Sequence, residues 1–381
     1  MSFAPTVAGQ GYVSVQVWDD AGSGWHSAGM WGTAVTSLNP TGWGWTGLGQ
    51  VSNPCDGPST NVPGALSVSA GYYHSLALKS DGTVWAWGWN GMGQLGDGTN
   101  VTPFTRVKVQ GLSDVVAVAA GAYHSLAVRR DGSVWAWGWN NYGQLGDGST
   151  VDRNIPVRVR GLSGVRAVAG GWLHSVAVGP GGVVSAWGWN SVGQLGDGTT
   201  TDHHVPVAVP GLADIDDISA GVGHTLALRH DGAVFAWGWN AFGQLGDGTA
   251  VDRNFPVAVI GVSRAHRVAA GCYHSLTAGI DEGGARVWAW GWNRVGPLGD
   301  GSTESRKTPV PVPRTELGRV AERRLRAQRR RRLRREGVGL GLERVRTARC
   351  RLPENQLVPA PAPVVRSATT VSAGALHTLS A

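Results

Sequence analysis

The side chains best suited to chemistry in this sequence are histidines that recur in nearly identical surroundings. A histidine can act as a general acid or base near neutral pH, and it can also bind a metal ion. A catalytic site needs one histidine oriented by partners of its own, whereas these copies share the same neighbours along the chain. We therefore interpret them as structural, with each ring hydrogen-bonded to backbone between strands. They are His74, His124, His174, His224 and His274, fifty residues apart, and His377, which follows after 103 residues.

Aspartates in the repeated motif GQLGDGT are the second group that could do chemistry. A calcium loop would need acidic residues at alternating positions and a final Glu, and the motif lacks both. An Asp between two glycines is typical of a tight turn in which the carboxylate accepts hydrogen bonds from nearby backbone. The sequence also lacks phosphate-binding, GxSxG and HExxH motifs. We therefore predict no catalytic residue, no metal site and no cofactor. The aspartates are Asp97, Asp147, Asp197, Asp247 and Asp300.

The repeated unit predicts four short β-strands. In the copy that begins at Ser69, two β-prone runs flank Asp81-Gly82, which favours a hairpin with a type I′ turn and positive φ at both positions. In Trp85–Trp89 indoles alternate with Ala and Gly, so we interpret these indoles as blade core, with the small residues facing a tightly packed neighbouring sheet. The proline-containing Ile155–Val159 reads as a further strand, with the proline marking a strand start or a sheet edge, and the run ending at Gly121 supplies the fourth. Four strands per fifty residues are typical of a β-propeller blade.

The two ends of the chain carry complementary parts of one repeat. The last residues, SAGALHTLSA, contain the histidine slot without the following WGWN, whereas Trp43–Gln50 matches WGWNGMGQ without a preceding GxxHS. Pairing these parts in one blade would remove two free sheet edges. We therefore predict an all-β, seven-bladed propeller that is closed by N- and C-terminal half-blades.

One repeat has the expected length but the wrong residues. Val338, Leu340 and Leu342 can be encoded by GTG, CTG and CTG. In a frame shifted by one base, the last two bases of each codon and the first base of the next one read TGG, which is the only codon for Trp. These positions follow Trp288, Trp290 and Trp292 by fifty residues. The shifted frame also permits SAGYAHSVAV and VWAWGWNAFGQLG. We interpret this blade as disrupted by an apparent frameshift. The predicted organisation is an unassigned segment 1–27, a half-blade 28–67, five repeats in 68–313, an Arg-rich aberrant repeat 314–352, and a return to the repeat with the C-terminal half-blade in 353–381.

The net charge of +7 comes from the aberrant repeat. Residues 314–352 contain 15 Arg and 4 Glu, which leaves 18 basic and 22 acidic residues in the rest of the chain. Outside this repeat the chain is mildly acidic, so we predict no nucleic-acid partner. Shifted frames of GC-rich genes encode many arginines, which favours a bacterial source.

Cysteines and hydrophobic segments limit the class of protein further. Three cysteines provide neither a disulfide framework nor metal-ligand spacing. No apolar run is long enough for a transmembrane helix, so we predict no membrane partner. The N-terminus lacks the pattern of a secretory signal, which predicts a cytoplasmic protein for the chain as written. An extracellular or cell-surface protein is the alternative if the chain is a fragment.

Several motifs in fixed order carry a family resemblance. The segments AGxxHSLAL, the DG turn, VWAWGWN and GQLGDGT resemble the repeat of the regulator of chromosome condensation family, in its bacterial type. The resemblance covers about residues 65 to 313 and the last dozen. It implies a seven-bladed propeller.

Positions that vary between copies are the candidates for function. The two residues before each histidine, and one residue before each GQLG, vary and are often aromatic, as expected of a protein-binding surface. We predict that the chain is not an enzyme and binds another protein. Guanine-nucleotide exchange on a small GTPase, implied by the family, is one alternative, and a propeller enzyme with a channel-mouth site is another. The candidate binding residues are Tyr72, Tyr73, Tyr123, Trp172, Tyr273, Tyr142 and Phe242.

Overall fold

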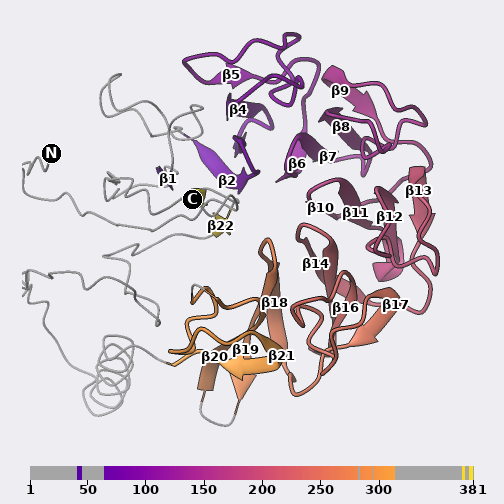
Figure 1. Ribbon diagram of the computed structural model, residues 1–381. Coiled ribbons are helices and arrows are strands. Elements are labelled where there is room, and N and C mark those ends of the chain that lie inside the picture. The colour runs from indigo at the N-terminus through magenta and orange to yellow at the C-terminus, as the bar shows by residue number, and fades with distance from the viewer. Residues whose placement is uncertain are drawn as a thin grey trace, which may run out of the picture.

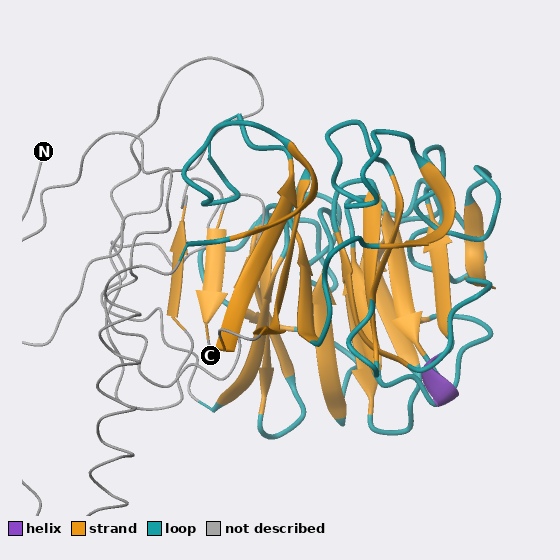
Figure 2. Cartoon of the chain, turned by 90° about the horizontal axis from the view of Figure 1, so that it is seen from below, coloured by secondary structure: helices purple, strands orange, loops and turns teal. Residues whose placement is uncertain are grey.

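The computed structural model describes residues 41–44, 64–281, 284–294, 296–313, 371–373 and 377–380. Within these ranges the chain is built from β-strands, with one 3₁₀ turn, η2 (Pro180–Gly182). Five antiparallel four-stranded sheets follow one another around a common axis, and the first strand of each lies nearest the centre (Figure 1). Seen from the side, the strands run roughly along this axis, so that the loops gather at its two ends (Figure 2). This confirms the predicted all-β propeller architecture.

In each of the five blades the strands pair in chain order. The first blade contains β2 (Ala65–Ala70), β3 (His74–Lys79), β4 (Val84–Gly88) and β5 (Val107–Lys108), and the second contains β6 (Val115–Ala120), β7 (His124–Arg129), β8 (Val134–Gly138) and β9 (Arg153–Arg158). The third contains β10 (Ala167–Gly170), β11 (His174–Val178), β12 (Val184–Gly188) and β13 (His203–Ala208). The fourth contains β14 (Ile215–Ala220), β15 (His224–Arg229), β16 (Val234–Gly238) and β17 (Arg253–Ala258). The fifth contains β18 (Ala265–Ala270), β19 (His274–Asp281), β20 (Gly284–Gly291) and β21 (Arg306–Pro311).

A further sheet joins strands from opposite ends of the chain. Its order is β1 (Thr41–Gly44), β23 (His377–Ser380) and β22 (Val371–Ala373). Gly44 pairs with His377 in the same register in which Gly88 pairs with His74. Strands from the two half-repeats therefore share one sheet, as predicted. The segments predicted at 1–27 and 314–352 lie outside the described residues.

The hairpin turns differ from the predicted type I′ geometry. Only Gly82 of the Asp81-Gly82 pair has positive φ, at 75°, and its N–H donates to the carbonyl of Lys79. The Asp81 carboxylate accepts hydrogen bonds from the backbone N–H and the hydroxyl of Thr83, which holds the turn without a left-handed Asp. The turn is one residue longer than predicted because the Gly forms the bulge position after a type I turn. Gly181–Gly182 does have positive φ at both residues.

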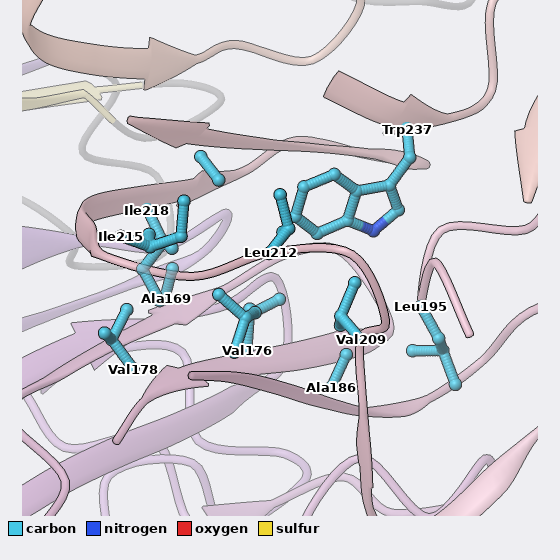
Figure 3. Packing of buried hydrophobic residues seen from close by; sticks show 12 residues of the cluster. Ala169, Val176, Val178, Ala186, Leu195, Val209, Leu212, Ile215, Ile218 and Trp237 are labelled. Atoms are coloured by element: carbon cyan, nitrogen blue, oxygen red, sulfur yellow. The ribbon is translucent and has the colours of Figure 1, made fainter. Parts of the chain in front are cut away.

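The hydrophobic core lies between neighbouring blades. Trp137 of β8 is fully buried and packs in one cluster with Val84 and Ala86 of the preceding blade. Figure 3 shows the same arrangement two blades later, where Trp237 lies over a cluster that includes Ala186. A small residue on one sheet leaves the space that the indole of the next sheet fills, as the alternating pattern predicted.

The outermost strands are sheet edges that carry proline. Pro156, Pro206 and Pro256 lie within β9, β13 and β17. A proline has no N–H to offer to another strand, so it blunts an exposed edge against pairing with a second molecule. Of the two positions predicted for these prolines, a strand start or a sheet edge, the structure shows the sheet edge.

The face of the fifth blade that points away from the fourth is less buried than its counterparts. Val287 is 41% exposed, whereas Val134 and Val184, at the same repeat position, are 0% exposed. His274 and Leu276 are half-buried, although the corresponding residues of the first four blades are fully buried. Among the described residues, no further blade covers this face.

Candidate binding face

The repeated histidines connect one blade to the next. His74 Nε2 lies 2.8 Å from the hydroxyl of Ser125, and His124 Nε2 lies 2.9 Å from that of Ser175. The Ser125 hydroxyl in turn donates to the Gln94 carbonyl, so the histidine Nε2 is the donor in the first bond. The prediction that these histidines are structural agrees with this geometry. The predicted partner was wrong, because the ring bonds a side chain of the next blade and not backbone between strands.

Burial keeps these rings neutral. It lowers the pKa of His124, His174 and His224 to about 3, and that of His274 to about 4. The rings of His124, His174 and His224 are closed off from solvent and uncharged at pH 7, so they can neither reach a substrate nor exchange a proton with it. The candidate functional residues must therefore be sought elsewhere on the propeller.

Replacing Ser175 with Ala is expected to lower the free energy of unfolding by about 1–3 kcal/mol. The substitution leaves the buried His124 Nε2 without its partner, and it removes one of the two donors to the Gln144 carbonyl, which keeps the bond from Trp187 Nε1. Urea denaturation measures the change. Ser163→Ala is the control, since this serine is exposed and its loss is expected to leave stability nearly unchanged. Equal midpoints for the two variants would contradict a structural role for the bond.

The repeated aspartates hold turns, as predicted. Asp147 accepts hydrogen bonds from the backbone N–H and the hydroxyl of Ser149, and it forms a 2.8 Å ion pair with Arg153. Burial alone would raise the pKa of Asp147, but the hydrogen bonds from Ser149 and Arg153 outweigh it and lower the pKa. Across the described ranges, no group of His, Cys, Asp and Glu could hold a metal ion. Nor does any helix in the described part of the chain have the length and apolarity to cross a membrane.

The third Trp of each WAWGW motif is not blade core, which corrects the sequence interpretation. Strand β4 ends at Gly88, whose φ of 108° turns the chain so that Trp89 leaves the sheet. Because Gly88 pairs with His74, Trp89 emerges at the same end of the blade as Tyr72 and Tyr73. The third indoles are half-buried, and they are Trp89, Trp139, Trp189, Trp239 and Trp292.

The tyrosines before the histidines stand between these indoles. The Tyr123 ring lies 5.8 Å from Trp89 of the preceding blade and 5.5 Å from Trp139 of its own, edge-on to both. Tyr273 repeats the arrangement, 5.4 Å from Trp239 and 6.2 Å from Trp292. Such edge-to-face pairs fix the orientation of each ring. Sequence reasoning missed the indoles, although the Gly between two Trp residues was a signal that the strand could end there.

These rings form two arcs at one end of the propeller. Six of the seven predicted binding residues belong to the arcs, and the seventh, Trp172, is half-buried at the repeat position that Tyr72 occupies in the first blade. The first arc comprises Tyr72, Tyr73, Trp89, Tyr123, Trp139, Tyr142 and Trp189. The second comprises Trp239, Phe242, Tyr273 and Trp292. We call these eleven residues and Trp172 the aromatic face.

The aromatic face carries no formal charge at neutral pH. Burial raises the pKa of the Tyr123 hydroxyl, with a further contribution from Tyr73, so this phenol stays protonated. The rings are half-buried, so each presents part of its surface to solvent while the rest is held by its neighbours. An uncharged and pre-oriented aromatic surface can bind by contact and desolvation, with hydroxyl and indole N–H groups available for hydrogen bonds.

Comparison with known proteins identifies the family. The model of the RCC1-like domain matches residues 24–277, and that of the regulator of chromosome condensation (RCC1) repeat matches residues 285–322. Human WBSCR16 is a similar solved structure, with 24% identity, a TM-score of 0.60, and coverage of 83% of this chain and 71% of that one. Yeast RCC1 (Prp20), solved bound to Kap60, has 19% identity, a TM-score of 0.51, and coverage of 97% and 89%. No curated protein sequence matches. Because the match to the RCC1-like domain covers two thirds of its residues, the chain belongs to the RCC1-like domain family.

Proposed function

We propose that this protein is a non-enzymatic module that binds another protein through the aromatic face. The observation that carries the proposal is the uncharged double arc of half-buried Tyr, Trp and Phe rings at one end of a rigid scaffold. Tyr and Trp dominate the binding energy of many protein interfaces because they bring much contact area with few rotatable bonds. The edge-to-face packing of Tyr123 between two indoles holds the ring in place before binding, which reduces the entropy lost on association.

The buried histidines support a non-enzymatic role. The groups that would serve as general acids or bases are repeated, neutral and used for packing between blades. The solved structure of Prp20p from Saccharomyces cerevisiae, 19% identical with a TM-score of 0.51 and coverage of 91% of each chain, is described together with its binding to Gsp1p and histones. A protein of this fold can thus have protein partners, which is compatible with the proposal.

The proposal is tested by alanine substitutions on the aromatic face. A partner is first isolated with the purified chain and confirmed with purified components by calorimetry. Tyr123→Ala is then expected to weaken binding by about 30-fold, which corresponds to about 2 kcal/mol at a hot spot. Tyr73→Ala and Tyr273→Ala are expected to act in the same direction. Phe255→Ala is the matched control, because Phe255 is an exposed aromatic residue of β17, outside the aromatic face.

The outcome separates the proposal from its alternatives. If all three Tyr variants bind the partner as tightly as the parent chain does, the aromatic face is not the binding surface. Guanine-nucleotide exchange is measured separately, as release of labelled nucleotide from a small GTPase. Accelerated release that survives Tyr123→Ala would favour exchange through another surface of the propeller.

A further inference from the structure

The residue before each repeated histidine is Tyr73, Tyr123, Leu173, Gly223 or Tyr273. Two of these positions lack a tyrosine, and only Gly223 has no side chain at all. Where the residue is Tyr123 or Tyr273, the ring stands between the third Trp of its own blade and that of the preceding blade. At Gly223 the corresponding place has no side chain. This place also separates the two aromatic arcs.

The backbone does not explain the glycine. Gly223 lies outside the positive-φ region that would require a glycine. A Cβ there would lie 3.3 Å from Trp239 Cβ and 3.4 Å from Val192 Cγ2, so a larger residue requires these neighbours to shift by a few tenths of an ångström. The blade before it contributes Val192, where the second and fourth blades contribute the larger Tyr142 and Phe242. Gly223 of the fourth blade and Val192 of the third are the two residues whose side chains could fill this place, and both are small.

The surroundings define what would fit. The backbone N–H of Trp239 donates to the Gly223 carbonyl, which fixes the own-blade indole beside the place. Trp189 of the preceding blade is expected on the other side, because Trp89 has this position relative to Tyr123. No residue named here carries a charge, so a charged group would lose hydration without gaining a partner. In two other blades the same molecule fills the equivalent place with a phenol ring, held edge-on by two indoles.

We infer that the place between Trp189 and Trp239, above Gly223, receives an aromatic side chain of the protein partner. The inference rests on the proposed function and specifies the partner as a polypeptide that presents a tyrosine-like side chain at its contact surface. Insertion of that ring would join the two arcs into one continuous aromatic surface. The partner would thereby complete a packing pattern that the chain itself sets at Tyr123 and Tyr273.

The probe for this site is N-acetyl-tyrosinamide, which carries the expected side chain on a neutral backbone. We expect weak but saturable binding to the full chain by saturation-transfer NMR, and none for N-acetyl-alaninamide. Gly223→Tyr fills the place and is expected to weaken probe binding by about tenfold or more. Val192→Phe fills it from the neighbouring blade without changing the Gly223 backbone, so the test survives if the first variant fails to fold. Phe255→Ala, at an exposed aromatic residue of β17 outside the aromatic face, is the control and is expected to keep the binding.

Two results would overturn the inference. One is the lack of saturable binding of the tyrosine probe to the parent chain. The other is binding that both filling variants retain. Failure here is distinguishable from failure of the proposed function: if Tyr123→Ala weakens a protein partner while Gly223→Tyr and Val192→Phe do not, the aromatic face binds the partner without an inserted ring at Gly223.

Discussion

The propeller is expected to lose stability steeply as the pH falls from 6.5 to 4. Burial lowers the pKa of His124, His174 and His224 from 6.5 to about 3, and that of His274 to about 4. In this window the unfolded histidines bind protons and the folded ones do not, so protonation favours the unfolded state. The contribution is complete above pH 6.5 and decreases by as much as about 1.4 kcal/mol per pH unit for each histidine.

Chemical denaturation at a series of pH values measures this effect. Hydrogen bonds lower the pKa of Asp147 and of Asp247 below 3.8, so the stabilising contribution of these two carboxylates is lost only as the pH falls below that value, outside the histidine window. His174→Asn removes one titrating ring and is expected to make the stability profile less steep between pH 6.5 and 4, although the variant is less stable at pH 7. A profile that is flat between pH 6.5 and 4.5 would show that the histidines are not held neutral in the folded chain.

The repeat architecture could be predicted because its signals are local and occur many times. Each fifty-residue unit contains its own turn and strand patterns, so one misread element is corrected by four other copies. The closing sheet was predictable for the same reason, since Gly44 and His377 occupy recognisable places in the repeat. The hairpin turn was misjudged because Asp-Gly fits two turn types, and the hydrogen bonds from Thr83 to Asp81 decide between them.

Features that depend on contact between blades could not be read from a single copy. The partner of His124 is Ser175, 51 residues away, and only the packing of two sheets brings them together. The role of Trp89 depends on the positive φ of Gly88 and on Tyr123 in the next blade. Gly223 is an ordinary small residue in its own copy, and it becomes notable only beside Trp239 and its neighbours in the ring. Candidate tyrosines were thus identifiable from sequence variation, but their arrangement was not.

The described residues leave one face of the fifth blade exposed, which is what we expect if the following repeat is disrupted by a frameshift. Val287, 41% exposed, occupies the position at which the other four blades bury a valine to 2% exposure or less. Each of those valines lies on the face that packs against an indole of the following blade, as Val84 packs with Trp137. The shifted reading of residues 314–352 contains the same VWAWGWN segment and a histidine followed by serine. The hydroxyl of that serine would accept a hydrogen bond from His274 Nε2, as the Ser125 hydroxyl does from His74 Nε2.

Restoring the reading frame across residues 314–352 is expected to raise the melting temperature and the protease resistance markedly. Burying the 41% of Val287 that is exposed would contribute about 1 kcal/mol, and an indole between two blades adds further buried area. Val287→Ser is the discriminating variant in thermal denaturation. It is expected to destabilise the restored chain strongly and to change the present chain little, because only the restored chain buries this side chain. If the two chains melt at the same temperature, or if Val287→Ser affects them equally, the restored segment does not pack on the fifth blade, and the frameshift interpretation of this repeat is wrong.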